Sequence, residues 1–335
     1  MQPSKGLSAM VGKPETDAEI SVAAADDGVD LHDKASRRGP APRPMPAQRF
    51  QAAMDGHLSS AMTAAYQADG YLILENMFSR RDCEALMARA ADLVDDFDPG
   101  DAPTVFSTTA RDHDRDAYFA TSGGRIHFFL EDGAVAPDGS LNRDKAQSIN
   151  KIGHALHDLD PIFNDFSRHR KLATVARDLG CAQPLLLQSM YIFKQPGIGG
   201  EVVRHLDSTY LYTEPQSVFG LWIALQDATV ENGCMWALPR RHGTPLRHRY
   251  RYIDGALETE TLNPAPWPDA DKVPLDVRQG SLVVLHGSLP HRSDTNTSNT
   301  SRHAYALHVI DGACDYPADN WLGRPAHMPL RGFDT

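Results

Sequence analysis

The chain has 335 residues, of which 41% are hydrophobic and 23% are charged. This is ordinary globular composition, with enough length for one large core or two modest ones. The formal net charge of −11, from 33 basic and 44 acidic residues, argues against a nucleic-acid-binding surface and gives no support for attraction to anionic lipid.

The N-terminal sequence and the cysteines indicate the compartment. No apolar stretch reaches the roughly 18 residues of a membrane-spanning helix, and no secretory signal is visible. Glu15, Asp17 and Glu19 are residues that organelle transit peptides avoid. The four cysteines lie far apart without a CxxC pair, so we interpret them as small buried hydrophobes in a reduced compartment. We therefore expect a cytoplasmic protein with no nucleic-acid or membrane partner.

The first predicted elements follow a tail. Residues 1–55 are rich in Ala, Pro, Asp and Arg and include the run RRGPAPRPMPAQR, so we expect a poorly ordered tail there and a single domain over 56–335. Order is predicted to begin near Met62 with a helix, followed by a short strand at 71–74. Ser79 is expected to cap a second helix, because the apolar residues after it recur at helical spacing.

The middle of the chain is predicted to contain one strand and two helices. The segment GRIHFFLEDGAV at 124–135 is interpreted as a strand. KIGHALHDLDPIFNDFSR at 151–168 and RKLATVARDLG at 170–180 are predicted to be helices. The second of these helices is expected to end at Gly180.

From Pro184 onward the predicted elements are strands. The runs are short, apolar and β-favouring, and Gly, Pro, Asn and Asp separate them. Strands at this spacing without helices between them favour an antiparallel sandwich or barrel over a parallel sheet. We therefore predict a mainly β protein with flanking helices, in which N-terminal helices pack on a jelly roll. The runs are PLLLQSMYIFKQ, VFGLWIALQDA, CMWALP, SLVVLHG and RHAYALHVID.

The motif HLD at 205–207 is the first sign of chemistry. In an extended segment, residues two apart point to the same side, so His205 and Asp207 can converge on one metal ion. His291 offers a third ligand from a distant segment. Two histidines and one carboxylate leave three coordination positions open, which suits Fe(II) oxygenases.

The HxD pattern alone would favour a surface histidine beside a solvated aspartate. The residue that changes this interpretation is Arg302, which follows His291 at the head of a strand pattern. Its planar guanidinium can bind the far carboxylate of 2-oxoglutarate through two parallel bonds. His286 is an alternative third ligand at the edge of a predicted strand, but the position of Arg302 favours His291.

Several segments of this sequence resemble the phytanoyl-CoA dioxygenase superfamily, in particular the branch named phytanoyl-CoA dioxygenase domain-containing protein. The likeness covers about residues 62–330. It implies a double-stranded β-helix, a cupin-like jelly roll, with Fe(II), 2-oxoglutarate and O2, and ascorbate as an accessory reductant. The segments are INKIGHALH, QSMYIFKQPGIGGEV, HLDSTYLYTEP, WIALQDATVENGCMWALPRRH and SRHAYALHV.

The resemblance also implies roles for individual residues. His205, Asp207 and His291 match the catalytic iron ligands. Arg302 matches the anchor of the 2-oxoglutarate carboxylate, with Ser293 assisting it. Four further positions match the lining of the cosubstrate pocket: Lys151, Met190, Leu206 and Trp222.

These four positions also have plainer interpretations. By pattern alone, Lys151 would be a solvated lysine, and Trp222 and Met190 would be core residues. Leu206 stands where relatives often carry Gln, which puts that one contact in doubt.

The predicted reaction is hydroxylation of a C–H bond in a small metabolite or natural-product intermediate, with release of succinate and CO2. Asp207 in the carboxylate position favours hydroxylation over halogenation. Desaturation, cyclisation and demethylation are alternatives on the same scaffold. A zinc-dependent hydrolase using the same ligands would leave Arg302 unexplained. A non-catalytic jelly-roll binding module is opposed by the three intact ligand positions.

Overall fold

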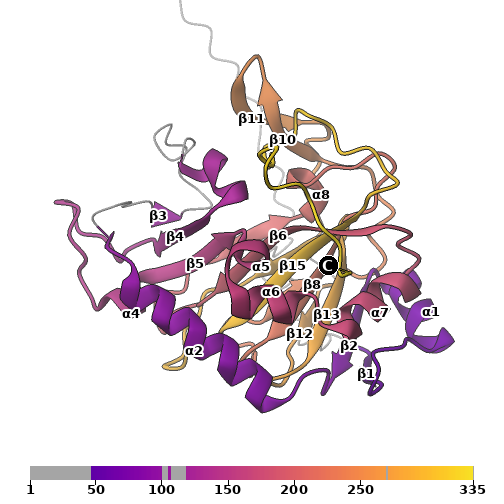
Figure 1. Cartoon of the computed structure of the whole chain (residues 1–335), viewed down its shortest axis with the longest axis horizontal. Coiled ribbons are helices and arrows are strands. Elements are labelled where there is room, and N and C mark those ends of the chain that lie inside the picture. The colour runs from indigo at the N-terminus through magenta and orange to yellow at the C-terminus, as the bar shows by residue number, and fades with distance from the viewer. Residues whose placement is uncertain (1–46, 100–104, 107–117, 269–270, 335) are drawn as a thin grey trace, which may run out of the picture. The chain divides into compact units, whose positions relative to one another are not determined.

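The computed structural model describes residues 47–99, 105–106, 118–268 and 271–334 (Figure 1). Most of the expected tail lies outside these residues. Its end contains strand β1 (Arg49–Gln51), which pairs in parallel with β2 (Tyr71–Glu75). The single domain at 56–335 stays a prediction. Within the described residues, no helix combines the length and apolar character needed to cross a bilayer.

The larger sheet has nine strands in the order β1-β2-β13-β8-β15-β6-β5-β4-β3. Its inner neighbours are antiparallel, and the β1–β2 and β3–β4 pairs at the two edges are parallel. The remaining strands are β3 (Val105–Phe106), β4 (Ile126–Glu131), β5 (Ile149–His154), β6 (Pro184–Ile192), β8 (Phe219–Ala224), β13 (Leu282–His286) and β15 (Ala304–Asp311).

A smaller sheet of four strands, in the order β12-β9-β14-β7, faces the larger one. Side chains of both sheets share a buried cluster, in which Trp222 and Ala306 of the larger sheet meet Met235 and Ala237 of the smaller. The two sheets are open and form a sandwich. The strands are β7 (Val202–His205), β9 (Met235–Ala237), β12 (Val273–Leu275) and β14 (His291–Ser293), and a separate hairpin joins β10 (His248–Ile253) to β11 (Ala256–Thr261).

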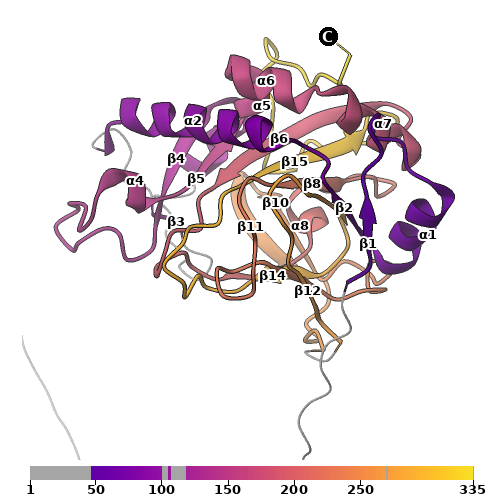
Figure 2. The same ribbon diagram turned by 90° about the horizontal axis from the view of Figure 1, so that it is seen from below.

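Helices cover the other face of the larger sheet (Figure 2). Helix α2 (Arg80–Asp96) begins at the predicted cap Ser79, whose hydroxyl accepts from the Asp82 amide. Helix α7 (Arg170–Asp178) is followed by Gly180 with φ +89°. The other helices are α1 (Ser60–Asp69), α4 (Lys145–Ser148), α5 (Leu156–Leu159), α6 (Pro161–Ser167) and α8 (Asp207–Tyr210), with a 3-10 turn at Ser122–Gly124. The prediction of a mainly β protein with flanking helices is confirmed, and all five runs after Pro184 contain strands.

The predicted helix at 151–168 is wrong in its first part. Residues 149–154 form β5, which pairs with β4 on one side and β6 on the other. This pairing satisfies the backbone polar groups in a buried sheet, so tertiary context overrides the helical pattern. Helix resumes in α5 and α6, and Asp160 caps α6 by accepting from two backbone amides. Sequence reasoning also missed α8, a short helix between strands.

Candidate metal centre

Strand register determines which side chains face the space between the sheets. In the larger sheet, Gly220 of β8 pairs with Leu285 of β13 and His308 of β15. In the smaller sheet, His291 of β14 pairs with His205 of β7. Residues opposite one another share a face of a sheet. His205 and His291 therefore share one face of the smaller sheet, and His308 and Gly220 share one face of the larger sheet.

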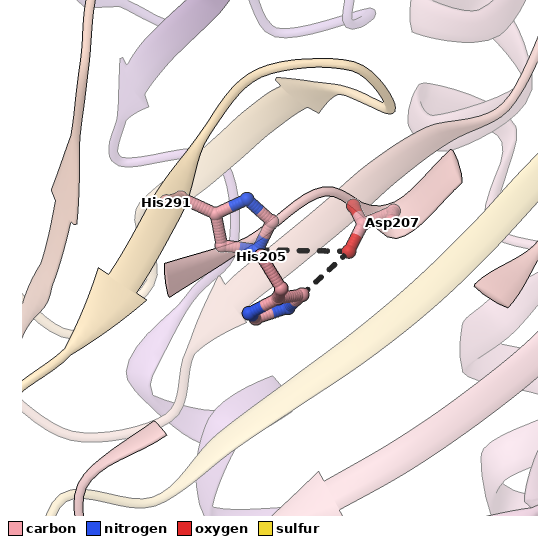
Figure 3. A group of neighbouring side chains, drawn as sticks. All are labelled: His205, Asp207 and His291. Atoms are coloured by element: carbon pink, nitrogen blue, oxygen red, sulfur yellow. Dashed lines mark ion pairs between the residues drawn. The ribbon is translucent and has the colours of Figure 1, made fainter. Parts of the chain in front are cut away.

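His205, Asp207 and His291 converge in this space (Figure 3). Their potential ligand atoms all lie within 4.8 Å of one another. Oδ1 of Asp207 is 3.8 Å from Nε2 of His205 and 3.5 Å from Nε2 of His291. Leu206 between them is extended, with φ −117° and ψ 138°. The expected convergence therefore occurs, although Asp207 is already the first residue of α8.

Backbone carbonyls fix the orientation of both histidine rings. Nδ1 of His205 is 2.9 Å from the Val203 carbonyl oxygen, and Nδ1 of His291 is 2.9 Å from that of Leu289. Each Nδ1–H can donate to a carbonyl two residues earlier, which leaves the Nε2 lone pair available to a metal. Burial also lowers the pKa of His205 to about 4, so its imidazole is neutral at pH 7.

Asp207 supplies the negative charge of the group. Its side chain is buried. Burial alone would raise the pKa of this carboxyl, but the surrounding imidazoles outweigh it and hold the pKa below its usual range. The carboxylate is therefore ionised at neutral pH. Two imidazole nitrogens and one carboxylate oxygen form a donor set that fits a divalent transition metal.

His286 lies outside this group. Its Nδ1 accepts from the Ser288 amide at 3.1 Å, and its ring packs 5.0 Å from the ring of His242. Among the described residues, the three potential ligands that come together are those with His291 as the third member.

His308 is a residue that sequence reasoning missed. It lies on β15, is 6% exposed, and its Nε2 is 3.4 Å from Oδ1 of Asp207. No motif marks this histidine. Its position depends on the register between β15 and β8, which a single sequence does not reveal.

Arg302 and its neighbours form a second polar group. The Arg302 side chain is 2% exposed, and its Nη2 donates to the Gly233 carbonyl at 3.2 Å. The Ser293 hydroxyl donates to the same carbonyl at 3.3 Å, and the guanidinium lies 5.3 Å from the centre of the Trp222 ring. In the described part of the chain, Nε and Nη1 of Arg302 have no hydrogen-bond partner. This guanidinium therefore has unused donors that an anion would satisfy.

Two buried lysines add to the positive charge. Burial lowers the pKa of Lys151 to about 7, and burial together with repulsion by Arg302 lowers the pKa of Lys194 to about 7. The ammonium of Lys151 lies 5.2 Å from the centre of the Phe129 ring. Glu131 is buried and attracts both lysines and Arg302. Three buried basic side chains thus interact with one buried carboxylate. Sequence reasoning had not identified Lys194.

The other expected pocket residues have varied environments. Trp222 is buried and Met190 half-buried, and both pair with Ala306 on β15. Leu206 is buried, but alternation in the extended segment turns its side chain away from the side that His205 and Asp207 share.

Comparison with known proteins identifies the family. The family model for phytanoyl-CoA dioxygenase matches residues 66–304. The chain belongs to the phytanoyl-CoA dioxygenase family. A phytanoyl-CoA dioxygenase of Arabidopsis thaliana is 43% identical over 82% of this chain and 96% of that protein. Phytanoyl-CoA dioxygenase domain-containing protein 1 of Bos taurus is 42% identical over 82% and 97%. The predicted resemblance is confirmed, and so is the prediction of an oxidoreductase of the dioxygenase class.

Solved structures share the fold at lower identity. The non-haem, alpha ketoglutarate-dependent carbocyclase SnoK of nogalamycin biosynthesis superposes with a TM-score of 0.55 and 19% identity, over 84% of this chain and 99% of that chain. EctD from S. alaskensis gives 0.56 and 18%, over 88% and 91%. These likenesses agree with the predicted jelly-roll architecture.

Proposed function

We propose that this member of the phytanoyl-CoA dioxygenase family is a non-haem dioxygenase dependent on Fe(II) and 2-oxoglutarate, with iron held by His205, Asp207 and His291. The observation that carries the proposal is the convergence of the two Nε2 atoms and the carboxylate, with each Nδ1 engaged by a carbonyl. A related fold, the epimerase SnoN, has been crystallised with Fe3+ and alpha ketoglutarate. EctD has been crystallised with iron and with 2-oxoglutarate.

The basic side chains around Arg302 support 2-oxoglutarate as the cosubstrate, since Arg302 shares the Gly233 carbonyl with Ser293, which lies on the same strand as His291. A dicarboxylate bound at the metal through one end presents a second carboxylate at the other. Arg302 has two unused donor nitrogens for it. Ser293 lies on β14 of the smaller sheet and Lys151 on β5 of the larger. The buried guanidinium of Arg302, with the basic side chains of Lys151 and Lys194 that Glu131 also attracts, matches an anionic cosubstrate. Met190 and Trp222 would form apolar walls of the same pocket.

When bound, iron and 2-oxoglutarate supply the oxidising power, with succinate and CO2 as products. The protein would hold the iron through its three ligands and orient 2-oxoglutarate through Arg302, in a buried pocket that limits access of water. Hydroxylation of a small-molecule C–H bond is the outcome we propose, because Asp207 occupies the carboxylate position. The described fold also occurs in proteins called a carbocyclase and an epimerase, so cyclisation, desaturation and demethylation are the second candidates.

Cofactor dependence tests the proposal. Purified protein would be loaded with Fe(II) without oxygen, mixed with 2-oxoglutarate and then exposed to air or kept anaerobic. We expect succinate only with iron, 2-oxoglutarate and O2 together, and the same requirement for oxidation of an added substrate. Hydrolysis by the zinc-loaded protein under nitrogen would instead establish a zinc hydrolase. The absence of both metal binding and turnover would leave a binding module.

A matched pair of histidine variants tests the ligand assignment. His291→Gln removes a proposed ligand, whereas His286→Gln alters a histidine of the same segment that lies outside the group. We expect succinate release to be lost in the first variant and kept in the second. The reverse result would make His286 the ligand.

A further inference from the structure

Asp207 has a neighbour that the proposed metal site does not use. We propose that His308 is a positioning residue, which donates a hydrogen bond from Nε2 to Oδ1 of Asp207 and so holds the carboxylate in its metal-binding orientation. This inference rests on the proposed function, because it assigns a role beside the proposed iron ligands.

The distances favour contact with the carboxylate rather than membership of the ligand group. Nε2 of His308 is 3.4 Å from Oδ1 of Asp207, as near as Nε2 of His291 at 3.5 Å. His308 is nevertheless not among the residues whose ligand atoms all lie within 4.8 Å of one another. A carboxylate oxygen has two lone pairs, so Oδ1 can accept from His308 and still face a metal.

The histidines near Asp207 come from different sheets. His205 and His291 come from β7 and β14 of the smaller sheet, and His308 comes from β15 of the larger. His308 also differs in its other nitrogen. Carbonyls engage Nδ1 of His205 and His291, whereas Nδ1 of His308 has no hydrogen-bond partner in the described part of the chain. Asp207 is therefore the polar contact that accounts for a buried imidazole at this point of the core.

Gly220 makes room for this contact. A Cβ atom at this position would lie 3.3 Å from Oδ2 of Asp207 and 3.8 Å from Cδ2 of His308. Gly220 pairs directly with His308 across β8 and β15. A methyl group here would press on the carboxylate, because 3.3 Å is closer than most Cβ contacts. The space between strand and carboxylate thus depends on the absence of a side chain.

Loss of the partner that orients a metal ligand typically costs roughly 10–100-fold in metal affinity. We therefore expect His308→Leu, which removes the donor and keeps similar bulk, to weaken binding by that factor. His308→Gln, whose amide can still donate, should restore most of the affinity. Gly220→Ala keeps the imidazole but displaces its acceptor, so it should weaken binding as well.

The measurement is a titration of the full metal-free chain with Co(II), followed by its visible absorption, together with thermal unfolding of the metal-free protein. Tyr305→Phe is the matched control, because Tyr305 lies on the opposite face of β15 and its hydroxyl is 2.7 Å from that of Ser167. We expect this control to lose stability and keep its Co(II) affinity. Equal Co(II) affinity in His308→Leu and the wild type, or equal weakening in the control, would overturn the proposal.

A second arm separates positioning from direct coordination. In an Asp207→Ala background the acceptor is gone, so a positioning residue has nothing left to orient. We expect His308→Leu to cause no further loss of Co(II) affinity there, whereas a fourth metal ligand would still contribute. The function is tested separately by succinate release from the Fe(II)-loaded wild type. Tight Co(II) binding that depends on His308, without any succinate release, would contradict the proposed oxygenase function and still support the positioning role of His308.

Discussion

The two faces of strand β15 show how one short segment serves two purposes. On the outer face, Tyr305, Leu307 and Val309 are buried in the cluster beneath the helices. On the inner face, Ala304 and Ala306 are small and His308 is polar. The outer face fills space for stability, whereas the inner face leaves space and supplies a donor beside Asp207. Neighbouring residues on one strand should therefore respond to mutation in different measurements.

The largest effect is expected at Asp207, which the inner face of β15 contacts through His308. Asp207→Ala removes the only carboxylate of the ligand group and leaves two imidazoles. We expect Fe(II)-dependent succinate release to fall by more than about 100-fold, since even loss of a partner to a ligand costs roughly 10–100-fold. Fe(II) binding and succinate are both measured. Unchanged turnover in this variant would show that the proposed ligand group does not hold the catalytic metal.

Arg302→Leu should weaken the binding of 2-oxoglutarate. Truncating one partner of a buried charged hydrogen bond costs about 2–5 kcal/mol, so we expect the Kd for 2-oxoglutarate to rise by roughly 30-fold to several thousand-fold. Co(II) affinity measured without 2-oxoglutarate should stay within about threefold, because Arg302 lies outside the ligand group. Arg302→Lys should recover only part of the loss, since an ammonium cannot form the same fork. Equal 2-oxoglutarate binding in all three proteins would contradict the assignment.

Leu307→Ala tests the outer face of the same strand. Removing a fully buried leucine side chain should lower the free energy of unfolding by about 2–5 kcal/mol. We expect Co(II) and 2-oxoglutarate affinities of the folded protein to remain near the wild-type values. Chemical denaturation and ligand titration at low temperature measure the two effects. A large loss of ligand affinity without a loss of stability would contradict the assignment of the outer face of β15 to stability alone.

Local signals in the sequence were enough for much of the fold. Ser79 was recognised as a helix cap, and the apolar runs after Pro184 became strands, because capping and β-favouring patterns act over a few residues. The pattern at 151–168 failed, because pairing with two neighbouring strands decided the structure of β5. Such pairing joins segments that are distant in sequence.

The candidate site divides in the same way. The spacing in HLD indicated His205 and Asp207, and the pattern of a distant segment indicated His291 and Arg302. His308 and Lys194 gave no such signal. His308 approaches Asp207 only through the register of β15 with β8, and Lys194 adopts a left-handed backbone, with φ +43°, where it is packed near Arg302. Residues that act through tertiary placement are found from the fold.

The smallest expected effect concerns pH and Lys151. Burial lowers the pKa of Lys151 to about 7, so this lysine is mostly charged below pH 7 and mostly neutral above it. If its ammonium binds a carboxylate of 2-oxoglutarate, binding above pH 7 must be accompanied by uptake of a proton. The affinity gained from Lys151 should then decline by up to about tenfold per pH unit as the pH rises.

The ratio of 2-oxoglutarate Kd values for Lys151→Gln and the wild type isolates this effect. Lys194 and Glu131 also lie near the site and titrate in both proteins, so their contributions largely cancel in the ratio. We expect the ratio to be greatest near pH 6 and to decrease by several-fold by pH 8. Lys151→Arg, which stays charged, should show a flatter profile than the wild type. A ratio that stays constant between pH 6 and pH 8 would show that Lys151 does not contact the cosubstrate. Arg302 would then be the basic side chain that binds the carboxylate.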